Sequence, residues 1–175
     1  IADTKEIVQY VLQDNVEFGI IGAKLNHPSL HYEKYDVDEI IVVAPPDHPL
    51  SRKRRVTLQE LSNEPWIIRE EGSGTQITVE KALRKKGESL KEFKVVMEMG
   101  STSSVKEGVK AKLGLAFISG KAAEEELDQG VLSRIDVKGI EPITRQIYIV
   151  SHRGRTLSPI AIEFHRFLKR KKENE

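Results

Sequence analysis

Three short segments rich in glycine, serine and threonine are the part of this chain best suited to binding a ligand. They are Gly72-Ser73-Gly74-Thr75, Gly100-Ser101-Thr102-Ser103-Ser104 and Ile118-Ser119-Gly120. Each is predicted to join a strand to a helix, so it presents hydroxyls and unpaired amides at a helix N-terminus, where an anion is favoured. These segments predict a cleft for a small anionic or polar molecule.

A simpler interpretation is open for each segment, because serine and threonine are also common helix caps. For any one segment, capping alone is the more frequent case. Three such segments in one chain favour ligand binding, and the glycines beside Ser73 leave room for a ligand to approach the backbone.

Other chemistry finds little support. The chain has no cysteine, which excludes disulfides, cysteine-bound zinc, iron–sulfur clusters and thiol catalysis. Its five histidines form no H-x-x-x-H pair, so no metal site is expected. Residues 114–121 approach a phosphate-binding P-loop, but the glycine spacing is one residue too long. The sequence therefore does not predict an enzyme, although a serine and a base could still meet in the folded chain.

Composition indicates a globular chain that can bury a core. It has 175 residues, 38% of them hydrophobic, and 28 basic against 27 acidic side chains. No stretch approaches the ~20 apolar residues of a membrane span, and a net charge of +1 argues against a general polyanion binder. The basic runs at 52–55, 84–86 and 169–172 are interpreted as solvated surface. Absence of cysteine fits the cytoplasm, and the start at Ile1 is typical of an excised fragment.

Strands and helices are predicted to alternate about every dozen residues. A loop is expected from Gly22 to Asp38, and Ala161, Phe164, Phe167 and Leu168 are expected to form the apolar face of the last helix. Near-continuous apolar strands favour parallel pairing with helices on both faces. Prolines at 45–46 and 142 divide the chain into two lobes, so the expected fold class is α/β in two lobes. The predicted strands are 16–21, 38–44, 66–68, 93–99, 113–118, 131–137 and 147–151.

Several segments in order resemble the effector-binding domain of LysR-type transcriptional regulators. Their order and spacing over essentially the whole chain carry the resemblance, more than any single motif. The family usually has glycine where this chain has Lys112. The segments are Ala2-Asp3-Thr4, Glu17 to Ala23, Val42 to Pro45 with His48-Pro49-Leu50, Thr57 to Leu61, Trp66 to Thr75, Gly100-Ser101-Thr102, Lys112 to Ser119 and Leu157-Ser158-Pro159.

The resemblance implies two Rossmann-like lobes of the type II periplasmic-binding-protein architecture, joined by two crossover strands. Lobe I would hold residues 1–44 and 147–175, without its first strand–helix–strand, and lobe II residues 45–146. The family binds a small, often anionic effector between the lobes, needs no cofactor, and forms homodimers or homotetramers. It reads DNA through a winged helix-turn-helix domain that would precede Ile1. The implied effector contacts are Gly22, Ala23, Ser73, Gly74, Thr75, Ser101, Thr102 and Ser119.

Three functional hypotheses follow. The first is the effector-sensing domain of a LysR-type regulator. The alternative is a solute-binding protein of a transport system with the same fold. A third is an enzyme acting on a phosphorylated substrate, which would require a base near Ser73 or Ser101.

Overall fold

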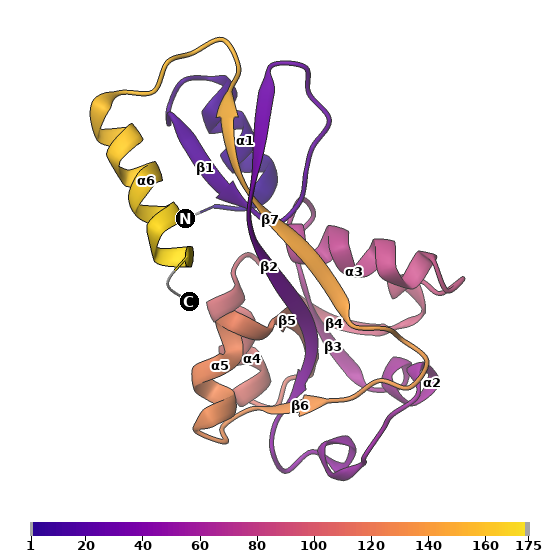
Figure 1. The fold of residues 1–175 in the computed structure, drawn as a ribbon. Coiled ribbons are helices and arrows are strands. Elements are labelled where there is room, and N and C mark those ends of the chain that lie inside the picture. Colours follow the sequence, from indigo (N-terminus) through magenta and orange to yellow (C-terminus); the bar gives the residue numbers. More distant parts are fainter. Residues whose placement is uncertain (1, 174–175) are drawn as a thin grey trace. The chain divides into compact units, whose positions relative to one another are not determined.

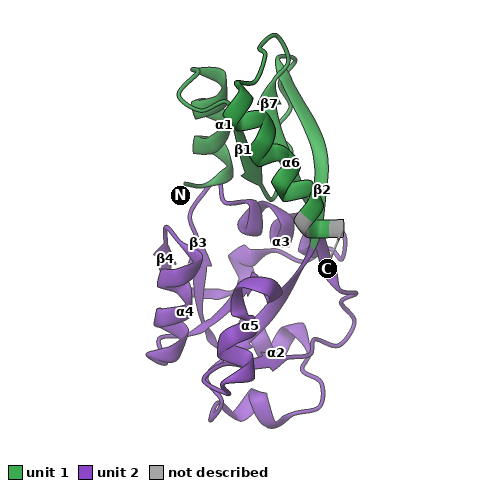
Figure 2. Cartoon of the chain, turned by 60° about the vertical axis from the view of Figure 1, so that its left-hand side comes forward, with its two compact units in different colours: residues 1–37, 146–175 green, residues 38–145 purple. Residues whose placement is uncertain are grey.

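The computed structural model describes residues 2–173 and divides the chain into two compact units (Figure 2). Unit 1 comprises residues 1–37 and 146–175, and unit 2 comprises residues 38–145. The chain passes between them twice, within β2 (Leu30–Ala44) and within β7 (Ile143–His152). The sequence-based boundary follows residue 44, whereas unit 2 begins at Asp38, because residues 40–44 are buried in its core. Ile1, the predicted start of lobe I, lies outside the described residues.

Unit 1 is built on a small antiparallel arrangement of β1 (Phe18–Ile21) and β7, with α1 (Thr4–Leu12) and α6 (Pro159–Glu173) (Figure 1). Asp3 caps α1, since its carboxylate accepts from the Glu6 amide at 2.9 Å. Successive side chains of β1 point to opposite faces of the strand. Ile21 packs with residues of α1, whereas Phe18 stacks on Phe164 of α6. The two helices therefore cover opposite faces of this strand.

The predicted apolar face of the last helix is only half confirmed. Ala161 and Leu168 are buried, but Phe164 and Phe167 are 51% and 53% exposed. The expected loop before Asp38 is wrong from Leu30 onward, where β2 already runs. This half of the strand is mostly polar and half-buried, so it lacks the continuous apolar run on which the strand predictions rested.

The sheet of unit 2 has mixed strand directions. β3 (Pro65–Arg69) lies between β4 (Lys94–Met99) and β5 (Leu115–Ser119), and all three are parallel. The expectation of uniformly parallel strands is wrong for β2, which pairs antiparallel with β5 on one side and with β6 (Ser133–Ile135) on the other. A strand that joins a sheet parallel to its neighbour needs a crossover connection, usually a helix. β2 enters this sheet directly from unit 1 without such a connection.

Helices cover both faces of this sheet, as the apolar strands predict. The short α2 (Leu58–Ser62) and α3 (Gly74–Arg84) pack on the face of Ile40 and Val42. The helices α4 (Thr102–Lys110) and α5 (Gly120–Asp128) pack on the face of Ile41 and Val43. Two 3-10 turns, η1 (Pro49–Arg52) and η2 (Leu90–Glu92), complete the unit. Alternate residues of one buried strand thus serve two hydrophobic clusters.

Lys112 explains why glycine is usual at its position in the family that the chain resembles. It follows α4 with φ of 61°, in the left-handed region that side chains with a Cβ avoid. The backbone geometry is therefore the one that glycine would adopt, reached here by lysine at a cost in conformational energy.

Candidate functional site

Three helices of unit 2 begin at one edge of its sheet. The strands β5, β3 and β4 are parallel neighbours, and each is followed by a glycine-, serine- or threonine-containing turn that opens α5, α3 or α4. Because the carboxyl ends of parallel strands meet at the same edge, the structure brings the three turns together there (Figure 1). This edge is the candidate site.

At the start of α5, the hydroxyl of Ser119 is fully engaged. It accepts from the Ala122 amide at 3.2 Å and donates to Asp38 Oδ1 at 2.9 Å. A hydroxyl has one proton, so Ser119 has none left to give to a ligand. For this turn, the capping interpretation accounts for the serine.

At the start of α4, Ser101 is also a cap. Its oxygen accepts from the Ser104 amide at 3.0 Å and lies 2.7 Å from the Ser104 hydroxyl. The neighbouring Thr102 hydroxyl accepts from Arg69 Nη1 at 2.9 Å, and Arg69 is held in turn by Glu70. Burial alone would raise the pKa of Glu70, but the hydrogen bonds and charge of Arg69 outweigh it, so this pKa lies below its usual value.

At the start of α3, the serine does not cap the helix. Ser73 occupies the N-cap position with extended backbone, yet it makes no capping hydrogen bond. It is only 1% exposed, and no hydrogen-bond partner of its hydroxyl is found among residues 2–173. Among residues 2–173, Glu126 Oε2 is the one side-chain polar atom that is both fully buried and without a hydrogen-bond partner. The Ser73 hydroxyl also lacks a partner, so it must keep some contact with solvent.

A buried ion pair joins the starts of α3 and α5. Arg145 Nε donates to Asp38 Oδ2 at 2.9 Å, and Nη2 lies 2.8 Å from the same oxygen. Arg145 Nη1 donates to Thr75 Oγ1 at 3.0 Å, while the other Asp38 oxygen accepts from Ser119. The contacts predicted from the sequence include neither Asp38 nor Arg145. They are 107 positions apart, in strands, and no local pattern marks the pair.

The remaining predicted contacts lie in unit 1. Gly22 and Ala23 follow β1 and are partly buried. The structure therefore brings together the six predicted residues of unit 2, namely Ser73, Gly74, Thr75, Ser101, Thr102 and Ser119, and places Gly22 and Ala23 in the other unit.

The site offers hydroxyls, amides and the guanidiniums of Arg69 and Arg145, but it places no base on Ser73 or Ser101, the serines that the enzyme hypothesis requires. Within residues 2–173, neither the Ser73 nor the Ser101 hydroxyl is hydrogen-bonded to a histidine, carboxylate or lysine, which disfavours the enzyme hypothesis. The same residues contain no group of three or more metal-binding side chains placed to hold an ion.

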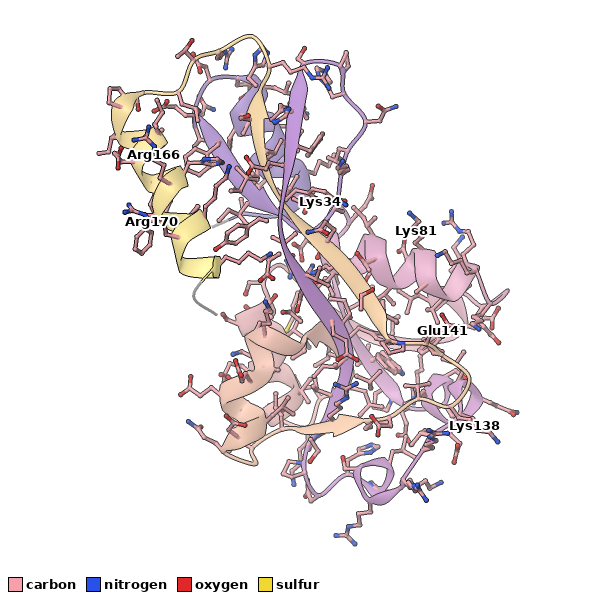
Figure 3. All side chains as sticks on the ribbon, in the orientation of Figure 1. Lys34, Lys81, Lys138, Glu141, Arg166 and Arg170 are labelled. Atoms are coloured by element: carbon pink, nitrogen blue, oxygen red, sulfur yellow. The ribbon has the colours of Figure 1, made fainter. Side chains whose placement is uncertain are left out.

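Several charged side chains outside the site are exposed, among them Lys138, Glu141 and Arg170. Figure 3 shows Arg170 on the outer side of α6, and Lys138 and Glu141 on the segment between β6 and β7. None of the helices within residues 2–173 is long and apolar enough to cross a membrane.

Comparison with known proteins decides the family. Residues 1–173 match the model of the LysR substrate binding domain. The chain belongs to this family. Relatives include the RuBisCO operon transcriptional regulator of Allochromatium vinosum, 33% identical over 168 residues, and the HTH-type transcriptional regulator CbbR of Xanthobacter flavus, 34% identical over 173 residues. They cover 96% and 97% of this chain, which spans only 54% and 50% of theirs.

Solved LysR regulatory domains share the fold. The CcmR regulatory domain of Synechocystis PCC6803 in complex with 2-PG superposes with a TM-score of 0.85 at 24% identity, covering 98% of this chain and 81% of that one. The effector-binding domain of QuiR in complex with shikimate gives 0.83 at 17% identity, covering 99% and 79%. The predicted periplasmic-binding-protein-like architecture is confirmed, and the relatives are transcriptional regulators, so the transport alternative is not favoured.

Proposed function

We propose that this LysR substrate-binding domain senses a small anionic metabolite, which binds at the N-terminus of α3. Ser73 carries the proposal. Its hydroxyl is nearly buried, reaches the surface and has no partner among the described residues. A polar group in such a position costs stability unless something accepts its proton. A ligand oxygen would do so.

The backbone around Ser73 is suited to the same ligand. The first amides of α3 have no acceptor within the helix, and the positive end of the helix dipole favours an anion there. Gly74 presents no side chain between the ligand and these amides. Thr75 accepts from Arg145, and no acceptor of its own proton is found among residues 2–173, so that proton is available to the ligand.

Similar proteins support an acidic ligand. The neighbours named above are complexes with 2-PG and with shikimate, both of which carry acidic groups. We extend this chemistry to the present chain. The other contacts that the resemblance implies, Gly22, Ala23, Ser101, Thr102 and Ser119, stay predictions, and we expect the Ser101, Thr102 and Ser119 hydroxyls, which already have protein partners, to add little to the affinity. In the complete protein, we expect a DNA-binding domain outside this chain, a homodimer or homotetramer, a cytoplasmic location and no catalysis.

Titration calorimetry of the purified chain tests the proposal. The probes are 2-phosphoglycolate, inorganic phosphate, sulfate and shikimate, and we expect at least one to bind. Ser73→Ala should then weaken binding by about 10-fold, the equivalent of one hydrogen bond.

The matched control is Ser101→Ala, which removes a hydroxyl from a neighbouring helix start where it serves as a cap. It should leave the affinity within about twofold. If no probe binds wild type, or if Ser73→Ala binds as well as wild type, the proposal is wrong.

A further inference from the structure

The function proposed above uses Arg145 only as the donor to Thr75 and gives Asp38 no role toward the ligand. We propose that Arg145 is the cationic group that receives the oxyanion of the ligand, and that Asp38 is the positioning residue that aims it. This inference rests on the proposed function, which it deepens by naming the residue that selects for charge.

Arg145 is held in one orientation with donors to spare. Its Nε and Nη2 are fixed by one oxygen of Asp38, and its Nη1 by Thr75. A guanidinium carries five N–H groups, so at least two have no partner among the described residues. The side chain as a whole retains 14% exposure, so it is not sealed within the unit.

Helix dipoles make this an unusual place for a cation. Thr75 lies in the first turn of α3 and Asp38 is bonded to the N-cap of α5, so Arg145 sits near two helix ends that are themselves positive. Asp38 offsets one unit of charge. With about +0.5 for each helix end, the cluster keeps a net charge of about +1.

Stability alone does not explain the pair. Burying two opposite charges is often no better for stability than apolar side chains of the same size. An arginine anchored on one side, with free N–H groups on the other, is suited to oxyanions, because its planar donors match two oxygens of a carboxylate or phosphate. The ligand class is therefore a carboxylate or phosphate.

The test uses a double variant, because Arg145→Gln alone would leave Asp38 buried without its partner and could unfold the chain. Asp38→Asn with Arg145→Gln keeps polar partners and leaves the net charge unchanged. Calorimetry with 2-phosphoglycolate, inorganic phosphate and glycolate should show binding weakened by about 10- to 100-fold, the range for charge-assisted hydrogen bonds. Inorganic phosphate carries only a phosphate group and glycolate only a carboxylate, so these two probes show which oxyanion Arg145 receives.

Two further variants distinguish ligand contact from structural support. Glu39→Gln with Arg134→Gln removes an exposed ion pair between neighbouring strands of the same unit and should change affinity by less than about twofold. Arg145→Lys keeps the charge without the planar donors and should bind between wild type and the double variant.

The outcomes separate this inference from the proposed function. If wild type binds a probe and the folded double variant binds it equally well, Arg145 is only structural and the inference is overturned, while the site at α3 stands. If wild type binds none of the probes, the proposed function fails and the inference fails with it.

Discussion

The starts of α3 and α4 are built from the same parts and differ in what those parts leave free. At each, an arginine is paired with a carboxylate and donates to a threonine in the first helical turn. The groups are Arg145, Asp38 and Thr75 at α3, and Arg69, Glu70 and Thr102 at α4.

The difference lies in the serine and in the distance along the chain. Ser101 caps α4, whereas Ser73 caps nothing. The α4 pair is made by adjacent residues, but the α3 pair joins two strands 107 positions apart. A pair of neighbours can hold its turn by itself. The α3 pair is assembled only by the complete fold of unit 2 and leaves a hydroxyl proton unused, as a binding site requires.

The largest contrast is expected in stability. Asp38→Ala should destabilise unit 2 by about 3–5 kcal/mol, because it leaves Arg145 buried without a counter-charge. Glu70→Ala should cost less, about 1–2 kcal/mol, since Glu70 is 19% exposed against 3% for Asp38, and Asp38 also accepts from Ser119. Urea unfolding followed by the single, fully buried Trp66 reports directly on this unit. Equal losses of unfolding free energy would mean that the two ion pairs contribute equally to stability.

Ligand affinity gives the next contrast. Thr75→Val removes a hydroxyl that accepts from Arg145 and keeps a free proton, so affinity for the best-binding probe should fall about 10-fold. Thr102→Val removes the equivalent hydroxyl at α4 and should change it less than about twofold. Calorimetry measures both. A larger loss from Thr102→Val would move the binding site to α4.

Removal of the serine hydroxyl should cost more unfolding free energy at α4 than at α3, the reverse of the order expected for the ion pairs. Ser101→Ala removes a bonded N-cap and should cost about 1 kcal/mol of unfolding free energy. Ser73→Ala removes a hydroxyl with no partner and should cost less than about 0.5 kcal/mol. The same Trp66 fluorescence assay compares them. A cost of about 1 kcal/mol at Ser73 would indicate an unrecognised structural bond.

Local rules were sufficient to predict most of this architecture. The caps at Asp3 and Thr57, and the helices after each serine-containing turn, follow from neighbouring residues, and the structure has them. Apolar runs located the buried strands. They missed the first half of β2, which is mostly polar and half-buried and has no apolar run of its own.

The candidate site was predictable only where it is local. Gly-, Ser- and Thr-rich turns marked three helix starts, but the sequence could not tell a capping serine from a free one. That depends on the rotamer and neighbours of a single hydroxyl. Arg145 and Asp38 carry no local signal, because each is one charged residue in a strand and only the fold brings them together.

The smallest effect is a pH dependence confined to the α4 pair. Since Arg69 lowers the pKa of Glu70, the ionised carboxylate stabilises the folded chain, and this contribution is complete above the unfolded pKa of about 4.5. It is lost as the pH falls through the lower folded value. The difference in unfolding free energy between wild type and Glu70→Gln should therefore be constant from pH 8 to 5.5 and shrink below pH 4.5. A difference that stays constant into that acidic range would show that Glu70 holds Arg69 by shape and not by charge, and the two helix starts would then differ in electrostatics as well as in capping.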